Sequence, residues 1–146
     1  MLENKIIKSA KGIITLKDRY LLQLRDNKKN IFFPGYWGLF GGRIDSNEMQ
    51  IKTVKREIKE ETNLNIKATR EILNIDFNMI GLKKKRNIIY YDCKVIDKNK
   101  KIILTEGQKY NFFSFEQIKK IKIIPMDFVA INCHFHKNKN FISLYR

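Results

Sequence analysis

Apolar and polar residues alternate over much of the chain, a pattern typical of β-strands. Lys8–Leu16 and Tyr20–Arg25 are expected to be strands on either side of a turn. Farther along, the same alternation predicts strands at Ile66–Ile80, Asn87–Ile96, Lys101–Thr105 and Tyr110–Phe115. Helical spacing instead predicts helices at Glu48–Thr62, Phe115–Ile121 and Pro125–Phe135. Strands and helices in this mixed order favour an α/β sandwich built on a mixed β-sheet.

The segment IFFPGYWGLFGGRIDSNE, between the second expected strand and the first expected helix, holds four of the seven glycines. Glycine adopts backbone angles that other residues avoid, so this segment is expected to be a loop of unusual geometry. Trp37 and Phe40 are expected to anchor the loop, with Phe40 in the core.

The first expected helix presents different side chains on different sides. An apolar stripe is expected to face the core, formed by Ile51, Val54 and Ile58. Glu57, Glu60 and Glu61 gather beside this stripe. Carboxylates so close together repel one another, and their oxygen atoms suit a hard cation such as Mg²⁺ or Mn²⁺. Taken alone, the helix is explained as well by solvated charges that make weak surface pairs.

Composition supports one globular domain, expected to span residues 1–146. Hydrophobic residues make up 43% of the chain and it has only 2 prolines, which excludes collagen-like and low-complexity classes. The charge is unusual, because 30 Lys and Arg face 15 Asp and Glu, for a net charge of +15. Such a surface attracts phosphate-rich partners, including nucleotides and nucleic acid, although a general bias toward lysine explains it equally well.

The pattern of cysteines and the lack of long apolar runs favour a cytoplasmic protein. Cys93 and Cys133 form no metal-binding pattern, so both are expected to be free thiols in a reducing compartment. The first residues contain no continuous apolar stretch of the kind found in signal peptides. No apolar run approaches the roughly 20 residues that a membrane-spanning helix needs, so no membrane partner is expected.

The glycine-rich loop and the carboxylate helix together carry a long motif. Residues 42–64 read GRIDSNEMQIKTVKREIKEETNL. This run resembles the Nudix box: Gly, five residues, Glu, seven residues, then Arg-Glu-U-x-Glu-Glu-x-Gly-U, where U is a bulky aliphatic residue. The chain departs from the box at Asn63, where the box has its last glycine, and more softly at Asn47. Asparagine tolerates left-handed backbone angles, so both positions are expected to keep the backbone geometry.

Resemblance to the Nudix family implies an α/β/α sandwich and an enzyme that uses Mg²⁺ or Mn²⁺ to hydrolyse a nucleoside diphosphate linked to another moiety. The implied metal ligands, which are also the catalytic carboxylates, are Glu57, Glu60 and Glu61, with the carbonyl of Gly41 or Gly42. Glu48 and Arg56 are implied to pair and, with Gly42, to hold the loop on the helix. Glu106 resembles the late glutamate that some relatives use as a further ligand or general base; the alternative is an acidic turn residue.

Substrate contacts are less well defined. Arg25 ends the second expected strand, where its guanidinium can bind a phosphate, and Trp37 can stack on a nucleobase. Some relatives read a purine edge with Asn or Asp near the start of the last helix, the place of Asp127, which can equally be the N-cap of that helix. His134 and His136 have no partners at metal-binding spacing and are expected on the surface.

The leading interpretation is hydrolysis of a small-molecule nucleotide, either a nucleoside triphosphate, oxidised ones included, or a nucleotide sugar. Products would be a nucleoside monophosphate with pyrophosphate or a sugar phosphate. Two alternatives stay open: removal of pyrophosphate from the 5′ end of RNA, with Lys83–Arg86 tracking the phosphate backbone, and a non-catalytic nucleotide-sensing module. Relatives are often dimers, so a homodimer is a further expectation.

Overall fold

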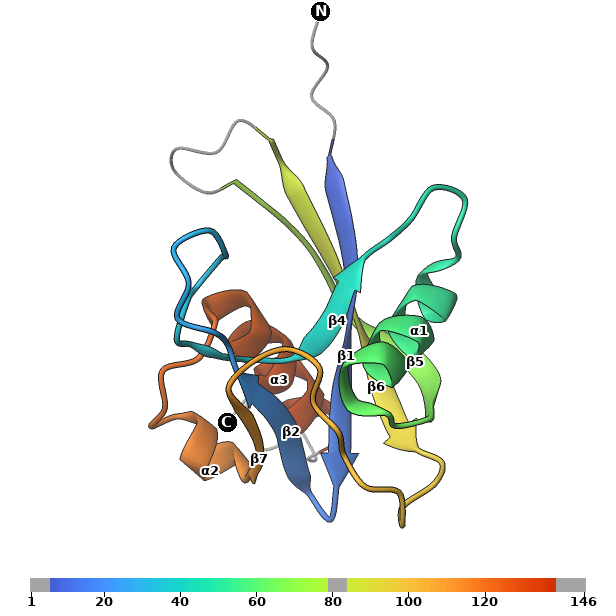
Figure 1. Cartoon of the computed structure of the whole chain (residues 1–146), viewed down its shortest axis with the longest axis vertical. Helices are drawn as coiled ribbons and strands as arrows, with labels where there is room; N and C mark the ends of the chain where they lie inside the picture. The colour runs from blue at the N-terminus through green and yellow to red at the C-terminus, as the bar shows by residue number, and fades with distance from the viewer. Residues whose placement is uncertain (1–5, 79–83, 139–146) are drawn as a thin grey trace, which may run out of the picture.

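The computed structural model describes residues 6–78 and 84–138, which form a seven-stranded sheet covered by helices (Figure 1). At the centre of the sheet, β1 (Ile7–Leu16) runs parallel to β6 (Arg86–Val95). The remaining strands pair in antiparallel fashion: β2 (Arg19–Leu24), β3 (Trp37–Gly38), β4 (Phe40–Arg43), β5 (Ile66–Phe77) and β7 (Lys109–Phe113). The sheet is therefore mixed, in the order β3-β2-β1-β6-β5, with β4 paired to β1 and β7 to β2.

Helices pack on both faces of this sheet, because successive residues of a strand point to opposite sides. Three helices are present among the described residues: α1 (Gln50–Thr62), α2 (Phe115–Ile118) and α3 (Pro125–Asn138). Ile14 packs with Val54 and Ile58 of α1 in one buried cluster, whereas Ile13 packs with Ile131 of α3 in another. Figure 1 shows α1 and α3 on either side of the central strands. The α/β/α sandwich is thus confirmed.

The expected strand at Lys101–Thr105 is wrong. These residues form no strand, and their backbone bonds the end of α1 instead: Ile103 N–H donates to the Thr62 carbonyl at 3.0 Å and Thr105 N–H to the Glu61 carbonyl at 3.2 Å. Ile102 and Leu104 pack beside the cluster under α1, which explains the apolar alternation without a sheet neighbour.

The glycine-rich loop also differs from expectation, because it contains the short strands β3 and β4. Phe40 is fully buried, as expected. The end of the expected strand at Ile66–Ile80 lies outside the described residues, and β5 is described to Phe77. Ile51, expected in the core, is 39% exposed in the first turns of α1, whereas Val54 and Ile58 are fully buried.

Both asparagines of the motif have the expected backbone. Asn63 caps α1 with φ 69° and donates its N–H to the Lys59 carbonyl at 2.9 Å. Asn47 has φ 64°. Each therefore keeps the left-handed angle that glycine usually provides.

His134 is not a surface residue, contrary to the expectation. It is 1% exposed, its Nε2 lies 2.8 Å from Asp92 Oδ1, and its Nδ1 lies 2.9 Å from the Tyr20 hydroxyl. A carboxylate only accepts, so Nε2 donates to Asp92, and Nδ1 shares a hydrogen bond with the Tyr20 hydroxyl. Hydrogen bonds from His134 and Thr69 lower the pKa of Asp92 in spite of its burial. This triad joins α3 to β2 and β6.

Cys93 and Cys133 are free, as expected, and burial raises the pKa of the Cys93 thiol to about 12. Among residues 6–78 and 84–138, no helix combines the length and apolar character needed to cross a bilayer.

Candidate active site

Arg56 fastens the loop after β4 to α1. Its Nε and Nη2 donate to the two oxygens of Glu48 at 2.8 and 2.9 Å, and Nη1 donates to Glu57 at 2.9 Å. Glu48 also accepts from the Thr53 hydroxyl at 2.7 Å. These hydrogen bonds, that of Arg56 foremost, lower the pKa of Glu48 to about 2. The expected pairing of Glu48 with Arg56 is confirmed.

Glu57 and Glu61 lie one turn apart on α1, against the backbone of β4. Gly42 leaves room for Glu57, since a Cβ at Gly42 would lie 2.6 Å from both carboxylate oxygens. Glu61 is only 7% exposed. Burial, together with the charges of Glu57 and Glu106, raises the pKa of Glu61 to about 8, although the backbone N–H of Gly41 favours its charged form. Gly42 is therefore a place where the backbone must approach a carboxylate closely, whereas a Cβ at Gly41 would meet the backbone of Ala10 and Lys11 in β1.

The donors suit a divalent cation by their chemistry. Glu57 shares Arg56 with Glu48 and Glu60, whereas Glu61 has no ion pair among the described residues. Oxygen-only ligands of this kind are preferred by Mg²⁺ and Mn²⁺. Glu60 is the most exposed of the three and lies 3.5 Å from Arg56 Nη1. Within the described part of the chain, no three His, Cys, Asp or Glu side chains already surround one metal position. Glu57 and Glu60 instead form ion pairs with Arg56.

A polar cavity of about 250 Å³, here called the carboxylate cavity, opens beside Glu61. Glu106, on the exposed loop before β7, lines this cavity. The structure thus brings it to the same cavity as Glu61. Gln23 of β2 donates from Nε2 to Glu61 over a long 3.4 Å. Its charged lining also includes Asp26 and three cationic side chains: Lys11, Arg25 and Lys28.

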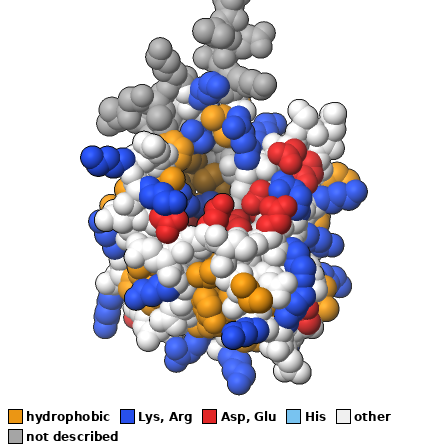
Figure 2. All heavy atoms as spheres, viewed as in Figure 1, with side chains coloured by type: hydrophobic (Ala, Val, Ile, Leu, Met, Phe, Trp, Pro, Cys, Tyr) orange, Lys and Arg blue, Asp and Glu red, His pale blue; other side chains and the backbone are white. Residues whose placement is uncertain are grey.

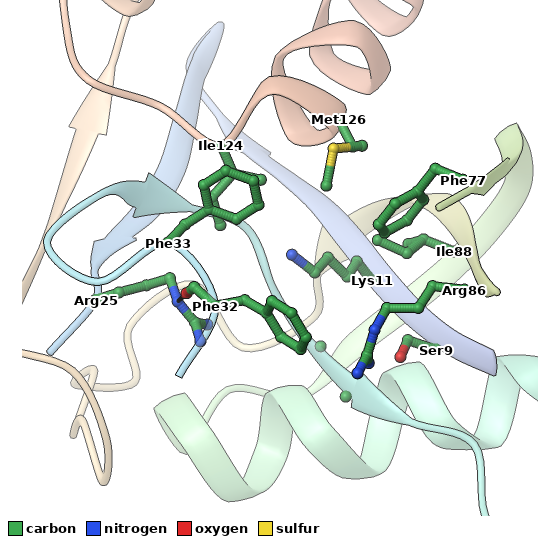
Figure 3. A pocket seen from close by; sticks show the side chains of 12 residues that line it. Ser9, Lys11, Arg25, Phe32, Phe33, Phe77, Arg86, Ile88, Ile124 and Met126 are labelled. Carbon is green, nitrogen blue, oxygen red and sulfur yellow. Dashed lines mark hydrogen bonds between the residues drawn. The ribbon is translucent and has the colours of Figure 1, made fainter. Parts of the chain in front are cut away.

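A second cavity of about 180 Å³, here called the aromatic cavity, lies next to the first (Figure 3). Apolar side chains form most of its wall: Phe32, Phe33, Phe77, Ile88, Ile124 and Met126. Lys11, Arg25 and Arg86 are its cations. Figure 3 shows the Lys11 ammonium reaching toward the space between Phe33 and Met126. The cavity therefore combines flat apolar surfaces with hydrogen-bond donors.

The loop between β2 and β3 supplies part of this wall. Tyr36 N–H donates to the Phe33 carbonyl at 3.2 Å across Pro34 and Gly35. Gly35 has φ 74°, and proline followed by such a glycine is the signature of a type II turn. Phe33 itself has φ 49°, an uncommon angle for a bulky residue and one often found at functional sites.

Lys11, Arg25 and Gly41 line both cavities. Arg25 is held by a 2.8 Å bond from its Nε to the Phe32 carbonyl. Lys11 is held by Asp127, whose two oxygens lie 3.1 and 3.0 Å from its Nζ. The carboxylates and the aromatic cavity therefore form one continuous site with a shared cationic wall.

Asp127 is not placed to read a substrate directly or to cap its helix. It lies in the first turn of α3, fully buried, and accepts from the Tyr90 hydroxyl at 2.7 Å and the Leu39 N–H at 2.9 Å besides Lys11. Its oxygens are thus engaged by other elements, and the residue positions Lys11.

Trp37 is also placed differently from expectation. Its ring packs edge-on against Phe113, 4.7 Å between centroids, and lines neither cavity. Phe32 and Phe33, a few residues earlier in the same loop, stand at the aromatic cavity instead. Of the three expected substrate residues, the structure therefore brings Arg25 alone to the cavities.

One interpretation of the sequence groups Arg86 with its preceding lysines, as a run that tracks the phosphate backbone of RNA. Lys84 and Lys85 are exposed, and Lys83 lies outside the described residues. Arg86 begins β6, and its guanidinium lies over the Phe32 ring, 4.1 Å from the centroid. No local pattern signals this contact, because the two residues come from distant segments that meet only in the folded sheet.

Figure 2 shows the site from outside. Acidic side chains gather on this face beside a hollow with hydrophobic side chains in its depth, and Lys and Arg side chains surround both.

Comparison with known proteins agrees with this geometry. Residues 7–130 match the NUDIX domain family. A MutT protein from Methanosarcina mazei has a similar structure, with a TM-score of 0.79 and 26% identity over 96% of this chain and 100% of that one. An Ap4A hydrolase from Caenorhabditis elegans has the same fold, with a TM-score of 0.71 and 19% identity over 89% of this chain and 96% of that one.

One curated relative is the oxidized purine nucleoside triphosphate hydrolase of Danio rerio, 37% identical over 54 residues. That match spans 37% of this chain and about a third, 35%, of the relative. Because the family match covers most of the sequence and the fold agrees, the chain belongs to the NUDIX domain family.

Proposed function

We propose that this protein hydrolyses free nucleoside triphosphates, oxidised purine nucleotides included, to a nucleoside monophosphate and pyrophosphate. The observation that carries the proposal is the shared wall of Lys11, Arg25 and Gly41 between the carboxylate and aromatic cavities. A ligand that spans this wall presents phosphates to one side and a flat ring to the other. Neither cavity reaches the roughly 300 Å³ of a typical small-ligand pocket, so each accommodates one part of the substrate.

Glu57, Glu60 and Glu61 would hold Mg²⁺ or Mn²⁺, with the backbone at Gly41 close by. The metal would neutralise charge on the phosphates and lower the pKa of a bound water. Glu60 is exposed enough to leave Arg56 for this purpose, because its side chain is 58% exposed.

The remaining steps fall to side chains of the two cavities. Arg25 binds phosphate oxygens from the shared wall, where its Nη atoms are not engaged by a carboxylate of the described chain. Glu106, exposed at the carboxylate cavity, takes the proton of the attacking water. Phe32 and Phe33 offer flat surfaces on which a base stacks.

A substrate panel tests the proposal. Purified protein with Mg²⁺ or Mn²⁺ is given nucleoside triphosphates, 8-oxo-purine triphosphates, nucleotide sugars, dinucleoside polyphosphates and 5′-triphosphate RNA, and the products are separated by chromatography. We expect a nucleoside monophosphate and pyrophosphate from free triphosphates, and a loss of at least about 100-fold in kcat for Glu61→Gln. Glu116→Gln, a change at an exposed α2 residue, is the matched control.

Turnover of nucleotide sugars or RNA in preference to every free triphosphate would contradict the proposal. Absence of turnover with any member, while nucleotides still bind, would favour a sensing module instead.

A further inference from the structure

We propose that Arg86 is a specificity-determining residue that selects nucleobases carrying a carbonyl oxygen, with Lys11 as the second donor of the same cavity. This inference rests on the proposed function, because it takes the aromatic cavity to be the place of the base. It concerns the choice of base and not the chemistry at the phosphates.

Arg86 carries unused hydrogen-bond donors. Among the described residues its side chain makes no hydrogen bond and no ion pair, and its Nε is buried without a partner. Its guanidinium lies over the Phe32 ring, 4.1 Å from the centroid. Burial, and to a smaller degree the charge of Arg43, lowers its pKa below the usual value. A buried donor without an acceptor costs free energy, so a ligand that supplies an acceptor relieves this cost.

The cavity around Arg86 is poor in acceptors. Its polar side chains are Ser9, Lys11, Arg25 and Arg86, of which Ser9 alone can accept. Asp127 lies behind Lys11, but its oxygens already accept from Lys11, Tyr90 and Leu39. An exocyclic amino group entering the cavity would therefore meet donors, whereas a carbonyl oxygen would meet Arg86 and Lys11.

The positions of the side chains agree with this assignment. Figure 3 shows Arg86 and Phe32 side by side at one end of the cavity and Lys11 reaching toward its centre. Phe77 and Ile88 lie on the side of Arg86, and Phe33 and Ile124 lie across the cavity. A ring placed between these apolar walls has its edge directed at the cations.

Inosine and adenosine nucleotides form the matched pair that tests this inference. Hypoxanthine has a carbonyl oxygen at C6 and a proton on N1, where adenine has an amino group at C6 and an unprotonated N1. The rest of the ring system is alike. We expect metal-free protein to bind IMP about 10- to 100-fold more tightly than AMP in isothermal titration calorimetry, the range of one charge-assisted hydrogen bond. With metal, kcat/KM for ITP should exceed that for ATP by a similar factor, chiefly through KM.

Arg86→Met keeps an apolar side chain over Phe32 but removes the donors. We expect it to weaken IMP binding by about 10-fold or more while AMP binding changes less than about threefold. Arg86→Lys should restore part of the preference. Arg19→Met, which removes an exposed arginine at the start of β2, should leave the IMP to AMP ratio unchanged. Lys11 is tested with Asp127 in the double variant Lys11→Met/Asp127→Asn, so that no buried carboxylate is left unpaired.

Equal binding of IMP and AMP by the unaltered protein would overturn the inference, as would an equal loss of both in Arg86→Met. Ribose 5-phosphate serves as a probe without a base; if it bound as tightly as IMP, Arg86 would be a phosphate ligand instead. Turnover of ITP and ATP at equal efficiency would refute base selection but leave the proposed function intact. Failure to hydrolyse any triphosphate would refute the proposed function, while the monophosphates would still report base preference.

Discussion

Glu48 and Glu61 are carboxylates of one motif in opposite surroundings. Glu48 accepts from Arg56 and Thr53, which favours its charged form. Glu61 is buried near Glu57 and Glu106, which disfavours its charged form. The first residue therefore stabilises the loop, whereas the second stores an unfavourable interaction that a bound cation removes.

Replacing Glu61 by Gln should raise the melting temperature of the metal-free protein by about 2–6 °C near pH 9, where Glu61 is charged. The neutral amide removes the repulsion with Glu57 and the cost of a buried charge. Mn²⁺ should raise the melting temperature of the unaltered protein and leave that of Glu61→Gln nearly unchanged in scanning calorimetry. A variant that melts lower and still responds to Mn²⁺ would show that Glu61 is a structural residue.

Glu48 gives a prediction of the opposite sign. Its pKa is about 2 in the folded chain against an ordinary 4.5, so the unfolded chain takes up the proton first as pH falls. The stability contributed by Glu48 is present above about pH 4.5 and is lost as pH falls toward about 2. In urea unfolding across this range, the free energy of unfolding should fall less steeply with decreasing pH for Glu48→Gln than for the unaltered protein. Glu116→Gln, at an exposed residue, should follow the unaltered curve.

At the scale of elements, α1 ends at a residue with a left-handed backbone angle, and its last carbonyls accept hydrogen bonds from an irregular segment. Asn63 ends the helix at φ 69°. The carbonyls of Glu61 and Thr62, left unpaired by the end of the helix, accept from Thr105 and Ile103. The end of α1 thus holds the chain that leads to Glu106 and links the carboxylate helix to the other wall of its cavity.

Asn63→Ala should destabilise the protein by about 1 kcal/mol, because alanine pays the full steric cost of a left-handed angle. Asn63→Gly, which restores the residue of the Nudix box, should match or slightly exceed the stability of the unaltered protein. Urea unfolding at constant pH gives both values. If the alanine and glycine variants unfolded alike, the cap would not depend on backbone angle.

The helix pattern, the carboxylate cluster and the left-handed asparagines could be predicted because each depends on residues close in sequence. The strand expected at Lys101–Thr105 could not be told from an irregular segment, because its alternation is satisfied by α1 and not by a sheet neighbour. Arg86, Phe32 and Lys11 meet only through the order of the strands. His134 looked like a surface residue because its partners, Tyr20 and Asp92, lie on distant strands.

At the scale of the whole molecule, the buried triad of Tyr20, His134 and Asp92 joins the α3 layer to the sheet. All three residues are buried, and Tyr20 belongs to the apolar cluster under α3. Burial and the charge of Asp92 raise the pKa of Tyr20, which keeps its hydroxyl protonated as a donor. The triad therefore fixes how the helix layer sits on the strands.

Tyr20→Phe should lower the free energy of unfolding by about 1–2 kcal/mol, since it removes the hydroxyl that forms a buried hydrogen bond with His134 Nδ1. Tyr110→Phe, at a residue 39% exposed on β7, should change stability by less than about 0.5 kcal/mol. Thermal and urea unfolding of the two variants give the comparison. Equal effects would mean that the ring of Tyr20 matters and its hydroxyl does not.

The shared wall between the cavities has a consequence for how this enzyme can diversify. Changes at Lys11, Arg25 or Gly41 alter both cavities at once, so selection on one property disturbs the other. Phe77, Arg86 and Ile88 belong to β5 and β6 and line the aromatic cavity, away from Glu61 and Glu106. Under the proposed function, changes at these positions alter the cavity assigned to the base and leave Glu61 and Glu106 untouched.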